Sequence, residues 1–571
     1  METAKRGIVF TNKARCRDCY RCVRMCPVKA IRMREGQAFV VEERCIACGT
    51  CIRECPQGAK TYRDDVDRAA RLVAGGRPVA ASVAPSFAAL FSEWERKRLP
   101  SALRKLGFNH VAETAVGAFA VAQATAEAVR ATPGRPHLCT ACPAVVSLIE
   151  QYHPDLAGAL VPVCSPMIAH ARQIRARLGA GAGVVFIGPC VAKKAEAERP
   201  EHAGVVDVAL TFAELTQWFA REGIVLKALE ESRFDEEPAG ASRHFPLVGG
   251  LARTAALSTD HLAADVIAIS GHAEIVEALE DIRARPAGVL VEALFCPQGC
   301  VNGPALPVER GLFSRRADVI AFAAHHPGRP DASAGDVGAR FAAAKAPGLP
   351  DVTEEQIERF LVATGKGNPD DRLNCGSCGY PSCRDKAIAV LQGMAEPEMC
   401  IPRMRRLAEQ RTDRIIETSP NGIVILDERL GIVHMNPAFA RHFMCSESVY
   451  GRHISYLMDP DLFERLASGG AARLEAISRH PNYGIVCHQI AYRLPEEKQY
   501  VGIFIDITNL QAGERKLNEL RTETYRQARE LLDHQIQMAQ KMAQFLGENT
   551  ARGEELVENL MKLTGEEGRK S

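Results

Sequence analysis

The sequence lacks the features of an exported or membrane-inserted chain. Residues 1–16 contain no apolar core of the kind that a signal peptide carries. No run of about 18 uninterrupted apolar residues occurs, so we expect no segment to span a bilayer. The 71 basic and 70 acidic side chains leave a net charge of +1, which gives no electrostatic reason to expect nucleic acid or an anionic membrane as a partner. We therefore expect a cytoplasmic protein that binds neither.

Cysteine, by contrast, is abundant, with 20 in the 571 residues. In a reducing compartment, clustered cysteines indicate metal binding rather than disulfide bonds. An extracellular disulfide scaffold is the alternative, and the missing export signal argues against it. A chain of this length exceeds what one hydrophobic core supports, which predicts roughly three to five domains.

Two copies of one cysteine motif lie near the N-terminus. Residues 16–27 and 45–56 both read C-x2-C-x2-C-x3-C-P, the pattern of bacterial ferredoxins with two 4Fe–4S clusters. In that pattern the fourth cysteine of each copy binds the other cluster. The predicted ligands are Cys16, Cys19, Cys22 and Cys55 for the first cluster, and Cys45, Cys48, Cys51 and Cys26 for the second. A zinc site, the alternative, has the wrong ligand count and lacks the Cys-Pro ending, so we expect an electron-transfer module.

Apolar strand-like runs alternate with Ala- and Arg-rich helical segments over the next 280 or so residues. A helix is predicted at 66–75 and strands at 78–85, 183–190 and 264–270. Such alternation predicts an α/β domain with a largely parallel sheet, whose functional groups usually follow strand ends. Cys142, Cys190, Cys296 and Cys300 each lie in a Pro- or Gly-containing stretch of this region, and four thiolates suffice for one cubane.

Three of these stretches, CTACPA (139–144), GPCVAKKAE (188–196) and EALFCPQGCVNG (292–303), together resemble the signature motifs of FeFe hydrogenases. The order, the spacing and the position of the ferredoxin module all match that family. The resemblance implies a cubane held by Cys142, Cys190 and Cys296, with Cys300 bridging it to a two-iron unit that carries CO and cyanide. It also implies that Lys193 and the loop Ala84-Pro85-Ser86 contact the two cyanides, and that Glu196 closes the second motif.

Several positions depart from the family pattern. The family has a second cysteine at position 141, which passes protons to the two-iron unit, and this chain has Ala141. The two methionines that pack on the unit are replaced by Gly188 and Leu294, and a family Glu-Glu pair aligns with 123–124. Proton transfer requires titratable groups within hydrogen-bonding reach of one another. We therefore expect hydrogen binding to persist and turnover to be slow.

A further cysteine set follows a Pro- and Gly-rich boundary at about 325–352. Its spacing, C-x2-C-x4-C-x16-C, consists of Cys375, Cys378, Cys383 and Cys400. The spacing resembles a small 4Fe–4S domain found in several redox proteins, and a structural zinc site is the alternative. The three clusters predicted upstream favour iron–sulfur here too.

The C-terminal region has the pattern of a sensor and a helix. Strands predicted within 421–436 and in two later runs, with a turn at 436–439, resemble a PAS domain, to which we assign no cofactor. Beyond it, Leu517, Ala528, Leu531, Met538, Met542 and Phe545 follow a three–four spacing. That spacing predicts a dimerising coiled coil; a helix folded back on the PAS sheet is the alternative, and the two do not exclude each other.

The sequence thus predicts a multidomain α/β and α+β protein. The expected domains are a ferredoxin domain (1–63), an FeFe-hydrogenase-like H-cluster domain (64–345), a 4Fe–4S domain (346–408), a PAS domain (409–510) and a helical dimerisation or output segment (511–571). The order resembles sensory FeFe hydrogenases, which implies H2 as ligand, a redox partner protein and a separate kinase, phosphatase or regulator as reader. The alternatives are a slow catalytic hydrogenase linked to ferredoxin and an iron–sulfur electron-transfer protein without the two-iron unit.

Overall fold

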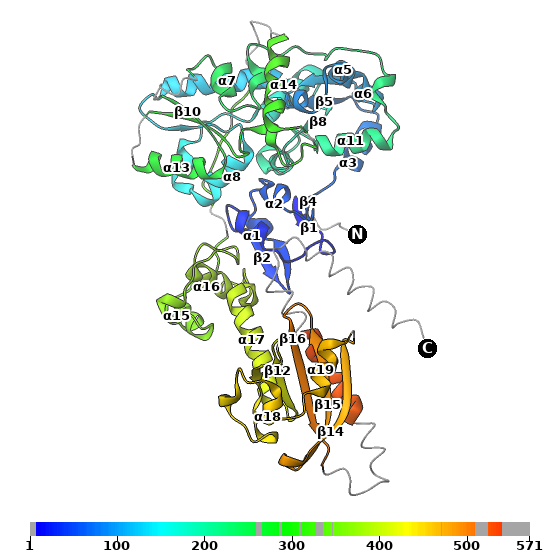
Figure 1. Ribbon diagram of the computed structural model, residues 1–571. Helices are drawn as coiled ribbons and strands as arrows, with labels where there is room; N and C mark the ends of the chain where they lie inside the picture. The colour runs from blue at the N-terminus through cyan, green and yellow to red at the C-terminus, as the bar shows by residue number, and fades with distance from the viewer. Residues whose placement is uncertain are drawn as a thin grey trace. The chain divides into compact units, whose positions relative to one another are not determined.

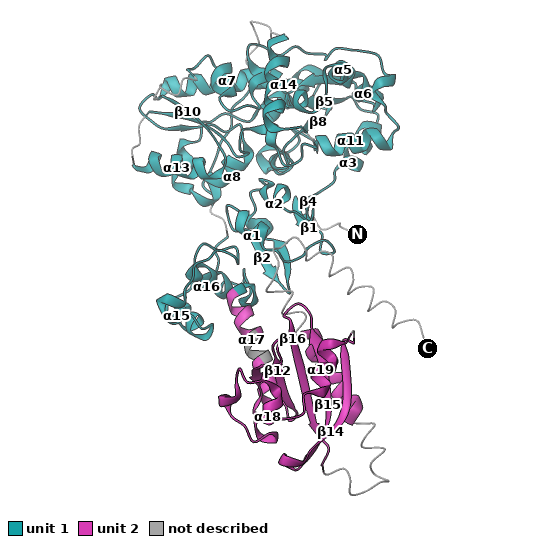
Figure 2. Cartoon of the chain, in the orientation of Figure 1, with its two compact units in different colours: residues 1–401 teal, residues 402–571 magenta. Residues whose placement is uncertain are grey.

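The computed structural model describes residues 7–258, 265–284, 288–307, 310–325, 335–344, 347–469, 471–508 and 524–538, excluding the side chains of 409–412. The chain forms two compact units, residues 1–401 and 402–571 (Figure 2). The division falls at the start of α17 (Ile401–Thr418), close to the predicted 408/409 boundary, and the finer division into five domains stays a prediction. Among the described residues, no helix has both the length and the apolarity needed to cross a membrane.

The N-terminal module of the first unit is built from short elements (Figure 1). Its strands pair antiparallel as β1 (Val9–Thr11) with β4 (Lys60–Tyr62) and β2 (Ile31–Arg34) with β3 (Gln37–Val40). Helices α1 (Arg21–Met25) and α2 (Thr50–Arg53) each carry the third cysteine of one motif copy. Both follow a residue with left-handed backbone, Tyr20 and Gly49, so the two motif copies fold alike.

The α/β region contains two parallel sheets. The first has the order β6-β5-β8-β9, formed by β5 (Val79–Val83), β6 (His110–Glu113), β8 (Gly183–Gly188) and β9 (Val208–Thr211). Every residue of these strands is buried, as expected of parallel strands that helices cover on both faces. The second has the order β10-β11-β7, formed by β10 (Val266–Ser270), β11 (Leu290–Leu294) and β7 (His137–Leu138).

Helices cover both sheets. Helix α9 packs on β5 and β8, while α3 and α11 pack on β8 and β9. The predicted helix at 66–75 is α3, and the predicted strands at 78–85, 183–190 and 264–270 are β5, β8 and β10. The helices of this region are α3 (Val66–Ala74), α4 (Phe87–Leu90), α5 (Glu93–Arg96), α6 (Leu99–Lys105), α7 (Ala115–Ala131), α8 (Pro143–Tyr152), α9 (Pro166–Leu178), α10 (Ala192–Ala197), α11 (Phe212–Arg221), α12 (Gly250–Thr254), α13 (His272–Ala284) and α14 (Leu312–His325).

A small helical module ends the first unit. Helices α15 (Glu354–Ala363) and α16 (Cys383–Leu391) pack through a cluster of Ile357, Leu361, Cys383 and Ala387. This module contacts the N-terminal one: the Met33 amide donates to Met394 O at 2.9 Å, and the Arg24 guanidinium donates to Ser377 O at 2.8 Å. The two modules, more than 350 residues apart in sequence, therefore share an interface.

The second unit holds an antiparallel sheet of order β13-β12-β16-β15-β14. Helices α18 (Pro437–His442) and α19 (Asp461–Ser468) contribute Phe439 and Phe463 to a fully buried aromatic core on one face. The strands are β12 (Gly422–Leu426), β13 (Ile432–Met435), β14 (Arg473–His480), β15 (Ile485–Leu494) and β16 (Gln499–Asp506). The two strands predicted within 421–436 are β12 and β13.

A helix over residues 524–538 covers the other face of this sheet. Leu532 is 2% exposed and packs with Ile503 and Ile505 of β16, whereas Leu531 is 40% exposed. Tyr525 lies against His488 of β15, with ring centroids 4.8 Å apart. The described part of the helix is thus folded back on the sheet, and the predicted coiled coil is not confirmed. Leu517, Met542 and Phe545 of the predicted seam lie outside the described residues.

Candidate metal centres

The carboxyl ends of the two parallel sheets supply the four cysteines of the α/β region. Cys190 follows β8 of the first sheet, while Cys142 precedes the first turn of α8, just after β7 of the second sheet. Cys296 and Cys300 follow β11, the neighbour of β7. Because strands of a parallel sheet end at the same edge, residues distant in sequence meet there.

The four sulfurs are close enough to influence one another's ionisation. Burial raises the pKa of Cys190 to about 12, and the neighbouring Cys142 raises it further. Burial also raises the pKa of Cys300, with Cys142 and Cys190 adding to the rise. For Cys296, burial and then the other three cysteines raise the pKa in the same way. Burial therefore holds the thiols of Cys190, Cys296 and Cys300 neutral, and the positive charge of bound iron is what would favour their thiolate form.

The loop carrying Cys296 and Cys300 is fixed by close backbone packing. The Cys300 amide donates to Pro246 O at 2.7 Å. Gly299 has a φ of +90°, and a Cβ there would lie 2.4 Å from Pro246 O, so only glycine fits without displacement. Gly303 similarly lies against Pro189, where a Cβ would be 2.6 Å from the carbonyl oxygen. The glycines of this motif hold the loop between two other chain segments.

Lys193 and Glu196 form a buried ion pair on α10. Lys193 Nζ lies 2.6 Å from Glu196 Oε2 and donates to Ala141 O at 3.4 Å. The two side chains are 8% and 6% exposed, and Lys193 acts to lower the pKa of Cys300. The structure therefore brings Lys193, Glu196, Ala141 and Cys300 into one neighbourhood. The adjacent Lys194 points elsewhere, to Asp65 and Glu214, each at 2.8 Å.

The Ala84-Pro85-Ser86 loop follows β5, beside the end of β8. The Ala84 amide donates to Ile187 O at 2.8 Å, and the Ala84 methyl lies near Gly188. Ser86 is 1% exposed, and its hydroxyl oxygen has no hydrogen-bond partner. A buried hydroxyl normally finds a partner. Together with the ammonium of Lys193, this orphaned group fits a polar, anionic ligand such as a cyanide-bearing two-iron unit.

Position 188 is filled by a neighbouring ring. A Cβ at Gly188 would lie 2.6 Å from the tip of the Phe186 ring, two residues earlier on the same face of β8. Leu294 at the end of β11 is buried, with its side chain near Gly299. At the two positions where the family resemblance implies methionine, the structure therefore has an aromatic ring and a branched aliphatic side chain.

Glu292, the first residue of the third motif, lies on β11, and its buried carboxyl group contacts the start of α12. It is 3% exposed and accepts hydrogen bonds from the Leu251 and Ala252 amides, at 3.1 and 2.9 Å. Burial raises its pKa to about 7, although those amides act against the rise. Glu292 in turn raises the pKa of both Cys139 and Cys300, so it lies within electrostatic reach of the cysteine site.

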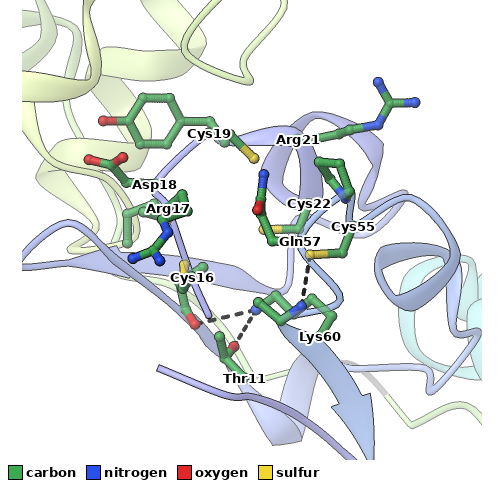
Figure 3. Close-up of a pocket in the computed structure, with 15 residues that line it drawn as sticks. Thr11, Cys16, Arg17, Asp18, Cys19, Arg21, Cys22, Cys55, Gln57 and Lys60 are labelled. Atoms are coloured by element: carbon green, nitrogen blue, oxygen red, sulfur yellow. Dashed lines mark hydrogen bonds between the residues drawn. The ribbon is translucent and has the colours of Figure 1, made fainter. Parts of the chain in front are cut away.

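The ferredoxin-like cysteines gather into two groups of four. Burial raises the pKa of Cys22 to about 11, and Cys19, Cys16 and Cys55 act on it as neighbours. Burial also raises the pKa of Cys51, whose cysteine neighbours are Cys48, Cys26 and Cys45. The first group lines an opening beside Lys60 (Figure 3). The grouping crosses the two motif copies as the sequence predicts, and it fits two cubanes.

The second ferredoxin-like group approaches the α/β site. A Cβ on Gly49, between Cys48 and Cys51, would lie 2.4 Å from the Pro304 ring at the end of the third motif. Arg53 of α2 acts to lower the pKa of Cys296 against the effect of burial. The two cysteine groups therefore face each other across a close contact.

A third cysteine site, after the α/β site and the ferredoxin-like site, also assembles from Cys375, Cys378, Cys383 and Cys400, and as the third site this set is called the third quartet. Burial raises the pKa of Cys378, with Cys400 and Cys375 as neighbours. Lys366 Nζ donates to Cys383 Sγ and to Cys400 Sγ, at 3.2 Å each. The ring of Tyr380 is within electrostatic reach of Cys378 and of Cys26 in the second ferredoxin-like group. Within the described residues, no three ligands converge on one point as they would around a single ion, whereas a cubane separates its thiolates because each binds a different iron.

Some residues at these sites carried no usable signal in the sequence. Lys366, Tyr380 and Arg53 lie outside the cysteine spacings and become visible only through contacts between distant segments. Glu292 had a signal, because it opens the third motif. Cys139 is buried near Glu292, and Cys164 is buried near Arg172.

Comparison with protein families identifies four regions of the chain. Residues 77–304 match the iron-only hydrogenase large subunit, C-terminal domain, and residues 8–56 match a 4Fe–4S dicluster domain. Residues 371–402 match an Fe–S cluster family, and residues 410–476 match a PAS domain. The chain thus combines a hydrogenase-like domain with iron–sulfur and PAS domains.

Individual relatives are distant. The chain is 24% identical to the NADP-reducing hydrogenase subunit HndD of Solidesulfovibrio fructosivorans, over 39% of this chain and 48% of the relative, so it spans about half of that protein. Among solved structures it overlaps [FeFe]-hydrogenase HydA1 from Chlamydomonas reinhardtii, with 18% identity, 50% and 100% coverage and a TM-score of 0.39. It also overlaps the PAS domain of an HTR-like protein from Haloarcula marismortui, with 23% identity, 18% and 99% coverage and a TM-score of 0.16.

Proposed function

We propose, from the premise that residues 77–304 are an iron-only hydrogenase large-subunit domain, that this protein is a sensory FeFe hydrogenase. In this proposal it binds H2 at an H-cluster, and the resulting redox state passes through iron–sulfur clusters to the PAS and helix module. One observation carries the proposal. The cysteines that would bind the cluster lie together with Lys193, while position 141, where the family has its proton-carrying cysteine, is alanine.

The ligand side of the site supports binding. Cys142, Cys190, Cys296 and Cys300 would hold the cubane, with Cys300 as the bridge to the two-iron unit. When bound, that unit supplies the place where H2 is split into protons and electrons. Lys193 holds a positive charge beside Cys300, and Glu196 fixes that ammonium at 2.6 Å. The buried Ser86 hydroxyl, which has no hydrogen-bond partner, would be a further donor to that unit.

The proton side of the site is poorly equipped. A methyl group at position 141 neither accepts nor donates a proton, and the Lys193 ammonium contacts only the backbone oxygen of that residue. General acid–base catalysis depends on a titratable group within hydrogen-bonding reach. Slow proton exchange suits a detector, because a hydrogen-induced change of state then outlasts a single encounter.

The remaining domains supply a readout. The close contact between Gly49 and Pro304 brings the second ferredoxin-like group to the H-cluster cysteines, and Tyr380 joins that group to the third quartet. A change of cluster charge acts on a partner only through an element with two alternative states. The PAS sheet with its docked helix is our candidate for that element, and a kinase, phosphatase or regulator would read it.

Infrared spectroscopy of the matured protein tests the proposal. We expect stretching bands of CO and cyanide under argon, and we expect these bands to shift under H2. A catalytic FeFe hydrogenase is matured in parallel as the control. If the control shows the bands and this protein does not, the two-iron unit is rejected, and an iron–sulfur electron-transfer protein remains. Bands whose frequencies do not change under H2 would reject the sensing role.

A slow catalytic hydrogenase is the second candidate. The intact pair of Lys193 and Glu196 favours it, since both residues belong to the motif that the catalytic family carries. Steady H2 oxidation with a dye acceptor, sustained over many turnovers even at a rate well below that of a catalytic member assayed alongside, would select this candidate.

A further inference from the structure

Lys366 is a buried lysine that contacts two thiols of the third quartet. It lies between α15 and Cys375, and it is 7% exposed. Its Nζ is 3.2 Å from both Cys383 Sγ and Cys400 Sγ. Its amide donates to Leu361 O at 2.8 Å, and its carbonyl accepts from the Arg372 guanidinium at 3.1 Å, so the backbone is held on both sides. The ammonium is therefore fixed at the quartet rather than mobile.

No carboxylate in the described part of the chain supplies a counter-charge to this ammonium. Among the described residues, its contacts are the two sulfurs, and no Asp or Glu pairs with it. A buried ammonium without a compensating charge is costly. Two neutral thiols compensate it poorly, whereas thiolates bound to an iron–sulfur cluster carry net negative charge. The position of Lys366 thus matches an anionic cluster held by these cysteines.

A second buried lysine lies on another side of the quartet. Lys386 of α16 is 3% exposed and donates to Pro397 O at 2.8 Å. It acts to lower the pKa of Cys378, against the effect of burial. Two ammonium groups therefore act on this quartet, and that of Lys366 lies within hydrogen-bonding distance of two of its sulfur atoms.

We propose that Lys366 raises the reduction potential of the iron–sulfur cluster held by Cys375, Cys378, Cys383 and Cys400. Reduction adds one electron from the reductant to the cluster, and no bond to a ligand forms or breaks. The added negative charge strengthens the two N–H···S contacts, so Lys366 stabilises the reduced form more than the oxidised form. Net charge and hydrogen bonds to the sulfurs are the terms that set such potentials.

This inference rests on the iron–sulfur assignment of the quartet and gives that site a role in the proposed sensor. A raised potential makes the site retain an electron that the other clusters deliver. Its ligand Cys400 directly precedes α17, the helix that leads in sequence to β12 of the PAS domain. The site where charge accumulates would then be the one covalently nearest the readout.

A redox titration of the full-length protein, followed by electron paramagnetic resonance, tests the inference. Dithionite is the reductant and no H2 is present, so the result does not depend on the two-iron unit. The signal of the cluster held by Cys375, Cys378, Cys383 and Cys400 is assigned as the component that disappears in Cys378→Ser. At the wild-type midpoint potential, we expect Lys366→Met to lower the ratio of reduced to oxidised cluster about tenfold, because the gain of the two N–H···S contacts on reduction amounts to roughly 1.4 kcal/mol. Lys366→Arg, which keeps the charge, should retain most of the reduced cluster.

Each outcome decides. An unchanged midpoint in Lys366→Met, with the ferredoxin-type signals also unchanged, overturns the inference. If Lys366→Met fails to hold the cluster, Lys366→Gln keeps a hydrogen-bond donor without the charge, and its midpoint is measured instead. Loss of the cluster from Lys366→Arg as well would overturn the role of charge. Zinc in place of four irons in the wild-type protein would reject the iron–sulfur assignment itself, which separates that failure from a failure of Lys366.

Discussion

In the proposed hydrogen site, Ala141 would leave the path for protons incomplete at its first step. Its backbone oxygen accepts from Lys193, while its methyl group offers nothing that titrates. We expect Ala141→Cys to raise dye-linked H2 oxidation on the order of 10²-fold, because a positioned general acid–base contributes at least that much. Ala141→Val, which adds volume without a titratable group, is the matched control and should give no gain. A rate that Ala141→Cys leaves unchanged would contradict this reading of position 141.

Glu292 predicts a pH dependence near neutrality. Burial raises its pKa to about 7, above the usual 4.5, so the folded protein binds its proton more tightly than the unfolded chain. The resulting stability is complete below pH 4.5 and is lost as the pH rises through 7, by roughly 3 kcal/mol in total. The protonated carboxyl should give a carbonyl stretching band that titrates near pH 7 and is absent from Glu292→Gln. A band that has already disappeared at pH 5 would contradict the prediction.

The sequence predicted the chemistry-bearing residues better than the residues around them. The cysteine groups follow from spacing and from the family resemblance, because ligands occur in fixed motifs. Lys366 and Tyr380 gain their significance from contacts with segments distant in the chain. The role of Phe186, whose ring fills the space beside Gly188, could not be predicted either. The spacing of residues in a motif does not show which neighbouring side chain fills the space beside a glycine.

Strand β16 shows why the C-terminal helix was ambiguous at the level of elements. Its residues alternate between two cores: Phe504 faces the α18–α19 side, and Ile503 and Ile505 face the helix over 524–538. A strand apolar on both faces indicates that both faces are covered. The apolar runs of the strands therefore indicated a docked helix. The spacing of apolar residues in the helix fitted both a docked helix and a coiled coil.

Two neighbouring leucines test the docking of this helix. Leu532→Ala removes a side chain that is 2% exposed and should destabilise the docked helix and sheet by about 2–5 kcal/mol. Leu531→Ala, at a position 40% exposed, should change little and serves as the control. Hydrogen exchange of peptides from β15 and β16 measures the difference. Equal exchange in the two variants would show that the helix does not rest on the sheet in solution.

Strands that are very short and depend on pairing with a distant segment cannot be predicted from the sequence. The strands β5, β8 and β10 were predictable because each is a continuous apolar run flanked by turn residues. Strand β7 consists of His137 and Leu138 alone, and it exists through its pairing with β11. Two residues contain no periodicity, so this strand, which leads into the Cys142 motif, could not be found from the sequence.

At the scale of the whole molecule, the order of modules follows from the sequence and their contacts do not. The N-terminal module contacts both the third motif of the α/β region, through Gly49 and Pro304, and the third quartet, through Arg24 and Ser377. From the order of the sequence alone, one would expect the third quartet to contact the hydrogenase-like domain that precedes it and not the N-terminal module. In the fold, the ferredoxin-like groups are the neighbours of both other cysteine sites.

The most direct test of a hydrogen sensor asks whether H2 at the α/β site changes the C-terminal unit. Hydrogen–deuterium exchange of the full-length protein is compared under H2 and argon, with the protein carrying its cubanes but lacking the two-iron unit as the control. We expect H2 to alter exchange in β15, β16 and the helix over 524–538 in the loaded protein, and to have no effect on the control. Identical exchange under both gases, in a preparation whose infrared bands do shift with H2, would contradict the account: hydrogen would then bind without being reported.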